Sequence, residues 1–446
     1  MSSGSRNYPH LQLETGLELN PKSNANYRTL ASVGYCEIIP DWPPHILSIG
    51  SSMNLEGETP ELPQNPTLTP LELELTPEAA PQVPVPAPEP AETRFLKWIL
   101  FGPRGVRVGW SVVLFLVLTF LIIAFLGLAS APILRKVMPQ KTSDFTPGAA
   151  IVQEILQFLG LLGAAAVCAW IEKRRIGDYN LRGPHSLRRF FAGLLSGFAA
   201  LSALVGVLYT GGWLHFGAVS LSGAAIWEFG ALWAAAFLLT GLSEEGMTRC
   251  YMLFTLTRGV NFWWALGTVG SFSLFAWLNS HGSGAGGVYL MTALGIVPCL
   301  MLHLRRAPSA GFWNAAWLTS TFFGYIHTFN PGESWIGIFS AAGIGFVFCV
   351  SVRLTGSAWW AIGFHAAWDW AQTFFYGTAD SGLVPKGHFL TTAPVGATLW
   401  SGGSDGPEGS VLVIAVVVLV LLFLLAVYGR TASSESTSPA VLSQLS

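Results

Sequence analysis

The sequence predicts an all-α, polytopic membrane helix bundle of about ten transmembrane helices, preceded by a disordered tail. Of its 446 residues, 51% are hydrophobic and only 11% are charged, whereas soluble domains carry about 25% charged residues. Apolar runs long enough to cross a bilayer recur from residue 109 onward. Backbone groups in lipid must be paired within helices or closed barrels, so these runs exclude a soluble globular protein.

The charges divide the chain into a tail and a membrane domain. Residues 1–93 contain 12 of the 25 acidic residues and 15 of the 27 prolines, but only 3 of the 23 basic residues. This composition predicts a disordered Pro/Glu-rich tail. Residues 94–108 form a basic juxtamembrane segment, which we expect to lie on membrane lipid. A membrane-embedded helical domain is expected over 109–430, followed by a disordered cytoplasmic tail over 431–446.

Ten apolar segments are predicted to cross the membrane. They are 109–131, 148–171, 190–211, 224–243, 262–280, 286–304, 311–329, 335–353, 357–376 and 410–429. Most basic residues between them fall on one side, so the positive-inside rule predicts a multi-pass plasma (inner) membrane protein with both termini in the cytoplasm. The Gly-, Ser-, Thr- and Pro-rich segment 377–409 then lies outside, where we expect an ordered rim rather than a linker.

Two adjacent carboxylates and an arginine follow the fourth apolar segment in LTGLSEEGMTRCY. The i,i+4 spacing of Glu245 and Arg249 predicts an ion pair on one helical face. Glu244 would point about 100° away around the helix, free to face a cavity and act as a general base. Alternatively, the helix ends at Glu244 and the three charges lie in the headgroup zone.

Two histidines occur in later apolar segments. His327 follows Phe323 by one turn in TFFGYIHTFNPGE, and His365 precedes Asp369 by one turn in GFHAAWDW. Asp369 could fix the tautomer of His365 by bonding one ring nitrogen, which leaves the other nitrogen for a substrate, a water or a metal. The competing interpretations are an interfacial His327 and a self-satisfied His365–Asp369 pair between helices.

Motifs of other intramembrane chemistries are absent from the sequence. There is no HExxH zinc motif, no GxGD aspartyl motif and no phosphate loop. The cysteines show no CxxC pair, so we interpret those within apolar runs as small buried hydrophobic residues.

The order EExxxR, FxxxH and HxxxD resembles the CPBP family of intramembrane proteases, also called the type II CAAX prenyl endopeptidase or ABI family. The likeness covers roughly residues 224–376. It implies that Glu244 activates the attacking water and that Glu245 and Arg249 support the site. It further implies that His327, His365 and Asp369 stabilise the oxyanion and position the water.

The spacing of the motifs departs from the family. The segments 262–280 and 286–304 lie between the first and second motifs, but an even number of inserted spans preserves the direction of every later one. An alternative alignment puts Asn279 of LFAWLN at the second-motif histidine. We favour His327 because the sequence HTFNPGE that includes it matches the family context.

The resemblance implies an endopeptidase that hydrolyses a peptide bond of a membrane-associated, CAAX-type or lipidated substrate by a glutamate-dependent mechanism, without a cofactor or nucleic acid. A zinc-dependent mechanism stays open, with Glu244, His327 and His365 as the ligands. Two non-protease functions also stay open. One is a catalytically silent scaffold or peptide-toxin immunity protein, and the other is a proton-coupled transporter that uses the same residues as a relay.

Overall fold

The computed structural model describes residues 91–102, 105–137, 145–279, 285–307, 309–330, 332–380 and 382–436. The predicted disordered tail lies outside these residues except for its last three, which begin the first helix, α1. The last ten residues of the predicted cytoplasmic tail also lie outside them. The final helix, α13, continues to Ser436, six residues past the predicted boundary of 430.

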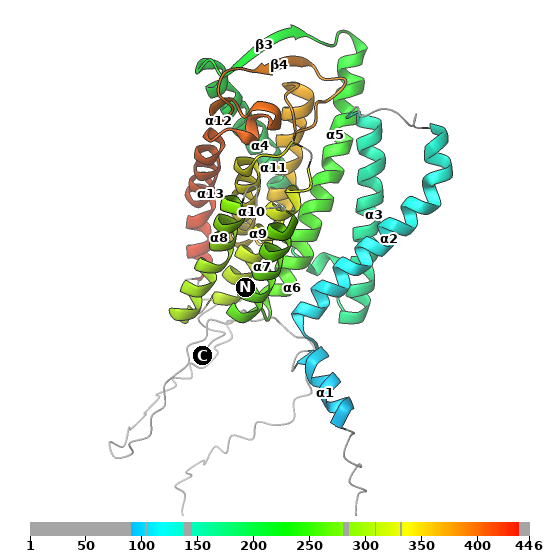
Figure 1. Cartoon of the computed structure of the whole chain (residues 1–446), viewed down its shortest axis with the longest axis vertical. Coiled ribbons are helices and arrows are strands. Elements are labelled where there is room, and N and C mark those ends of the chain that lie inside the picture. The colour runs from blue at the N-terminus through cyan, green and yellow to red at the C-terminus, as the bar shows by residue number, and fades with distance from the viewer. Residues whose placement is uncertain are drawn as a thin grey trace, which may run out of the picture. The chain divides into compact units, whose positions relative to one another are not determined.

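The described chain is almost entirely helical (Figure 1), which confirms the predicted fold class. Each of the ten predicted spans corresponds to a helix. These ten helices are α2 (Val108–Val137), α3 (Pro147–Glu172), α4 (Ser186–Thr210), α5 (Ala224–Glu245), α7 (Phe262–Asn279), α8 (Ala285–Leu304), α9 (Ala310–His327), α10 (Trp335–Thr355), α11 (Trp359–Trp370) and α13 (Leu412–Ser436). Three further helices, α1 (Ala91–Leu100), α6 (Leu253–Thr257) and α12 (Thr398–Ser401), are short.

Seven helices of the described chain are long and apolar enough to cross a membrane, fewer than the ten predicted spans. These seven include the continuous stretch from Ala224 to Thr257, in which α5 runs into α6. Of the remaining spans, the apolar part of α7 is short, α11 has only 12 residues, and α9 carries Asn, Ser, Thr and His side chains. The polar residues of α9 are largely buried within the protein, so this helix needs less apolar character than a lipid-facing span.

Two π-helical turns interrupt the helices beside the predicted motifs. The first, η2 (Gly246–Met252), joins α5 to α6 and contains Arg249. The second, η3 (Ala371–Phe375), continues α11 just after Asp369. Such turns often occur at functional sites, because they shift side chains relative to a regular helix.

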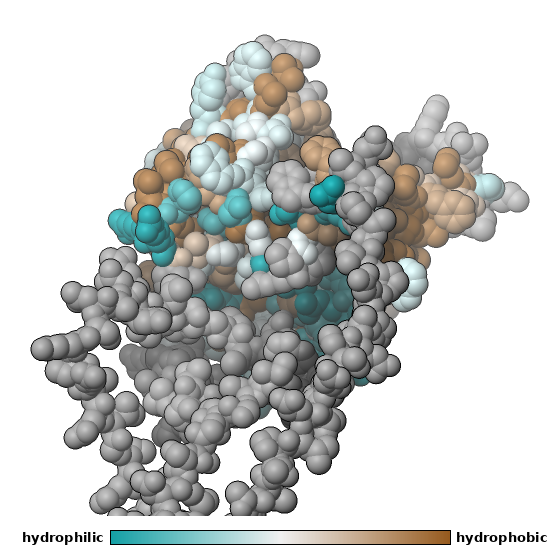
Figure 2. Space-filling view, turned by 90° about the horizontal axis from the view of Figure 1, so that it is seen from below, coloured by the Kyte–Doolittle hydropathy of each residue, from teal (hydrophilic) through white to brown (hydrophobic). Residues whose placement is uncertain are grey.

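The described residues of segment 377–409 lie at one end of the bundle, where a rim was expected. Within it, β4 (Leu390–Pro394) pairs antiparallel with β3 (Leu214–Val219), with Leu214 opposite Pro394. A second short pair, β1 (Phe101–Gly102) and β2 (Gly105–Val106), follows α1. In Figure 1, β3 and β4 lie at the upper end, and α6 lies at the lower end. Seen from below, hydrophilic residues gather on the face in view and hydrophobic residues flank it (Figure 2).

Glycines allow α4 and α11 to pack with their backbones in close contact. A Cβ on Gly193 would lie 2.1 Å from the carbonyl oxygen of Trp360, and one on Gly197 would lie 2.2 Å from that of Phe364. A Cβ on Gly363 of α11 would meet the carbonyl oxygen of Phe190 in the same way. Small residues at such contacts are typical of membrane helix pairs. This packing sets the position of α11, which carries His365 and Asp369.

We predict that Gly193→Ala destabilises the protein, because its methyl group would overlap the backbone of α11. Overpacking of this kind typically costs about 1–3 kcal/mol. Gly206→Ala on the same helix is the matched control, since nothing lies within 4 Å of a Cβ there and alanine favours the helix. Thermal unfolding in detergent should show a lower midpoint for Gly193→Ala only. Equal midpoints for the two variants would contradict the proposed packing.

Candidate active site

A cavity of about 410 Å³ lies within the helix bundle and is lined by α3, α5, α9, α10, α11, α13 and segment 377–409. Four of the six predicted site residues line it, namely Glu244 from α5, His327 from α9, and His365 and Asp369 from α11. The structure therefore brings together residues more than 120 positions apart. Glu245 and Arg249 do not line the cavity and are fully buried behind it.

Glu245 and Arg249 form a buried ion pair. Arg249 Nε lies 3.2 Å from Glu245 Oε2, and both side chains are 0% exposed. The Glu244 side chain instead lines the cavity and is 26% exposed. The helix therefore continues through this motif, and the three charges do not mark a helix end in the headgroup zone.

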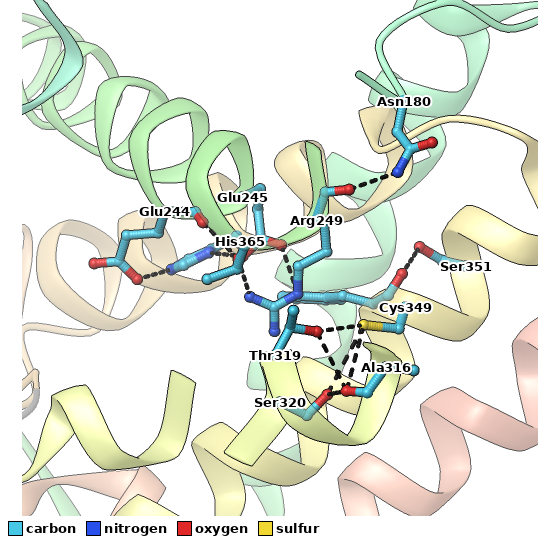
Figure 3. Close-up of polar contacts among 12 residues, drawn as sticks. Asn180, Glu244, Glu245, Arg249, Ala316, Thr319, Ser320, Cys349, Ser351 and His365 are labelled. Carbon is cyan, nitrogen blue, oxygen red and sulfur yellow. Dashed lines mark hydrogen bonds and ion pairs between the residues drawn. The ribbon is translucent and has the colours of Figure 1, made fainter. Parts of the chain in front are cut away.

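The Arg249 side chain is held between aromatic rings and hydrogen bonds. Its guanidinium carbon lies 4.3 Å from the ring centre of Phe323 and 5.4 Å from that of Phe348, positions that allow cation–π attraction. Arg249 also donates from Nη1 to the hydroxyl of Thr248, and its backbone oxygen accepts a hydrogen bond from Asn180 at 2.8 Å. Figure 3 shows Asn180 at the backbone oxygen of Arg249 and Glu245 beside the Arg249 side chain. Phe323 therefore contacts the site arginine as well as His327.

His365 is surrounded by three carboxylates (Figure 3 shows two of them). Its Nδ1 lies 2.8 Å from Glu245 Oε1, and its Nε2 lies 3.7 Å from Glu244 Oε2 and 3.4 Å from Asp369 Oδ2. The expectation that Asp369 fixes the tautomer is therefore corrected, because Glu245 makes the short hydrogen bond to Nδ1. Since Glu245 also pairs with Arg249, its two oxygens hold the arginine and the histidine in place together.

The tautomer of His327 follows from its hydrogen bond. Its Nδ1 lies 2.7 Å from the backbone oxygen of Phe323, which can only accept, so Nδ1 carries the proton. In the neutral ring, Nε2 is then an acceptor. The ring packs edge-on against Phe323 with the centres 4.7 Å apart. His327 can therefore accept a hydrogen bond from a water in the cavity.

Several cavity residues were missed by the sequence reasoning. Glu154 of α3 lines the cavity, as do Glu333, Asp380 and Glu408 near segment 377–409. Glu333 ends the stretch HTFNPGE that favoured His327, although it was not singled out there, and the other three belong to no short motif. The only sequence signals are a lone glutamate in an apolar run and acidic residues in a loop that is otherwise poor in charge.

The acidic residues near segment 377–409 are partly buried and lie near one another. Burial and the neighbouring Glu408 raise the pKa of Glu333 to about 9, and burial raises the pKa of Asp380 to about 6. Trp368 Nε1 donates to Glu408 Oε1 at 2.8 Å, and Thr373 Oγ1 donates to Asp380 Oδ2 at 2.7 Å. Glu333 is therefore protonated at neutral pH, which limits repulsion at this end of the cavity.

The zinc site that stayed open from the sequence would use Glu244, His327 and His365 as ligands. His327 and His365 each use Nδ1 in a hydrogen bond, to Phe323 and Glu245 respectively, which leaves Nε2 of each ring as the nitrogen that a metal could bind. Within the ranges that the structure describes, no three His, Cys, Asp or Glu side chains are arranged to hold a metal ion. We therefore derive the chemistry of the site from its side chains.

Comparison with known proteins identifies one family. Residues 299–371 match the model of the Rce1-like type II CAAX prenyl endopeptidases. The matched range includes His327, His365 and Asp369, but not Glu244, Glu245 or Arg249. No curated protein and no solved structure gives a significant match.

The family match and the motif order agree with each other. The match ends two residues after Asp369, and the contacts of His365 join it to both glutamates of the first motif. Residues 299–371 are thus similar to the Rce1-like type II CAAX prenyl endopeptidases, which supports the resemblance to the CPBP family, and the chain is an integral membrane protein.

Proposed function

We propose that this protein is an intramembrane endopeptidase in which Glu244 activates the attacking water. The observation that carries the proposal is that Glu244, His327, His365 and Asp369, from three helices, line a single cavity. A base, two imidazoles and a second carboxylate in one enclosed site are the components of a hydrolytic centre.

The chemistry begins with proton transfer from a water to the Glu244 carboxylate. The water oxygen attacks the carbonyl carbon of the peptide bond, and the carbonyl electrons move to its oxygen. His327 accepts a hydrogen bond from the attacking water through Nε2. When Nε2 of His365 carries a proton, it can donate to the oxyanion, with Asp369 and Glu245 holding the ring in place. Donors positioned in advance toward a developing charge contribute strongly to catalysis.

Glu245 and Arg249 are positioning residues in this proposal. Their ion pair is fully buried, so neither residue reaches a substrate in the cavity. Glu245 orients His365 through the 2.8 Å hydrogen bond to Nδ1. Their substitution should therefore change the stability of the protein as well as its rate, whereas substitution of Glu244 should change the rate alone.

We further propose that both termini are cytoplasmic. Basic residues follow α3, α6 and α8 and occupy the last turn of α10, all at the end of the bundle where α6 lies; they include Arg174, Arg258, Arg305 and Arg353. The positive-inside rule makes this end cytoplasmic. The cavity extends toward the opposite end, where segment 377–409 lies. The substrate class in this proposal is a membrane-associated protein segment, lipidated or not, that reaches the cavity from that side.

Glu244→Gln should abolish cleavage while the protein stays folded. Loss of a general base typically costs about 10²–10⁴-fold in rate. The measurement is cleavage of a prenylated CAAX peptide, and of unmodified membrane-anchored peptides, by the protein in liposomes. Glu228→Gln is the matched control, because Glu228 lies on the same helix and is exposed. Unchanged activity of Glu244→Gln in a functional assay would favour the scaffold, and altered proton flux without cleavage would favour the transporter.

The same cleavage assay distinguishes the zinc-dependent alternative. A chelator such as 1,10-phenanthroline should leave the rate of the wild type unchanged if Glu244 alone activates the water. A large loss that added zinc restores would overturn the glutamate-dependent mechanism.

Glu245→Gln should lower both stability and activity, because it leaves the Arg249 charge buried without its partner. Breaking a buried ion pair typically costs about 3–5 kcal/mol. The double variant Glu245→Gln/Arg249→Met removes both charges, so its thermal unfolding midpoint in detergent should recover toward the wild type. Its cleavage rate should stay low, since the neutral amide no longer orients His365 as a carboxylate does. Additive losses of stability in the double variant would argue against a coupled pair.

The proposed orientation predicts which loops react with reagents outside the cell. Ala397 is exposed at the end with segment 377–409, and Asn261 is exposed after α6. In a background with Cys36→Ser, Ala397→Cys should react with a membrane-impermeant maleimide in intact cells. Asn261→Cys should react only after lysis. The reverse pattern of labelling would place the termini outside.

A further inference from the structure

Glu154 is a buried carboxyl group that the chemistry above does not use. It lies about two turns into α3, is 7% exposed and lines the same cavity as Glu244. Its Oε1 accepts a hydrogen bond from Gln157 Nε2 at 2.7 Å, while Oε2 has no hydrogen-bond partner among the described residues. A buried polar atom without a partner is costly, and it commonly marks a place where another molecule binds.

The charged surroundings of Glu154 are those of the catalytic centre. Glu244, His327 and His365 line the same cavity as Glu154. No ion pair between described residues includes it. An isolated buried carboxylate is much more costly than the neutral acid, because burial removes the water that would solvate the charge. Burial at this position therefore favours the protonated form of the Glu154 carboxyl group, which can act as a proton donor.

Resting on the proposed function, we propose that Glu154 is the acid that protonates the leaving amine. Glu244 takes a proton from water, and hydroxide oxygen adds to the carbonyl carbon. When the tetrahedral intermediate collapses, the oxyanion electrons re-form the C=O bond and the C–N bond breaks. The nitrogen takes the proton of Glu154. A proton then passes from Glu244 to Glu154 through cavity water, which restores both groups.

Two carboxyl groups on different walls of the cavity suit this division of roles. Glu244 comes from α5 and Glu154 from α3, and these two helices pack against each other. An amine anion is a very poor leaving group, so cleavage of an amide requires a proton at nitrogen. Pairs of carboxyl groups with different environments commonly act as one base and one acid. The acid in this pair belongs to a helix outside the three sequence motifs.

The experiment compares two substrates that share an acyl part, a peptide amide and the matching activated aryl ester. The ester leaving group departs as an anion and needs no proton. The protein is used whole, in liposomes, as wild type, Glu154→Gln, Glu154→Asp and Glu244→Gln, with Glu228→Gln as the unaltered control. Unfolding midpoints verify that each variant is folded.

We expect Glu154→Gln to lower kcat for the amide by about 100-fold or more, but to lower kcat for the ester by less than about 5-fold. Glu154→Asp should recover part of the amide activity, because it keeps the acidic proton. Any decline at high pH that the wild type shows for the amide but not for the ester should vanish in Glu154→Gln.

Equal losses on amide and ester would show that Glu154 only shapes the cavity, and no loss on either would show that it has no role; both overturn the inference. Loss of both activities in Glu244→Gln together with the expected Glu154 pattern supports both proposals. If the folded wild type cleaves neither substrate, the proposed function itself fails and this inference fails with it.

Discussion

The arrangement of the site depends on the buried ion pair between Glu245 and Arg249. Two opposite charges with no exposed surface are stable only as a pair, because each alone would lack the water that solvates it. The arginine also contacts Phe323 of α9 and Phe348 of α10, and the glutamate contacts His365 of α11. The Glu245–Arg249 ion pair therefore connects the end of α5 with α9, α10 and α11 beside the cavity. The positions of the catalytic groups follow from it.

Helix geometry assigns different roles to the two adjacent glutamates. Consecutive side chains are separated by about 100° around a helix, so only one of them can face Arg249. Because Glu245 is the residue with the i,i+4 spacing, Glu244 turns toward the cavity, where its side chain is 26% exposed. Two identical side chains thereby differ in surroundings: Glu245 is a buried ion-pair partner, and Glu244 is the cavity-lining carboxylate that the proposed mechanism uses as base.

Local spacing was enough to predict the helices and the Glu245–Arg249 pair, because both depend on residues within one or two turns of each other. The hydrogen bond from His365 to Glu245 was not predictable, since it joins residues 120 positions apart and Asp369 was the nearer candidate in sequence. Glu154 was missed for a related reason: a lone glutamate in an apolar run has no neighbour that indicates its partner. Its place in the cavity depends on how α3 packs against α5.

The two helices that were expected to be inserted spans, α7 and α8, lie apart from the candidate site. Helices α7 and α8 pack against each other and against α9, and Ser273 of α7 is hydrogen bonded to Tyr325 of α9 at 2.9 Å and to Thr292 of α8. Neither inserted helix lines the cavity. An antiparallel pair returns the chain to the side from which it left, so α9 enters in the direction that places His327 opposite Glu244. An insertion of one span would have reversed α9 and put His327 at the other end of the bundle.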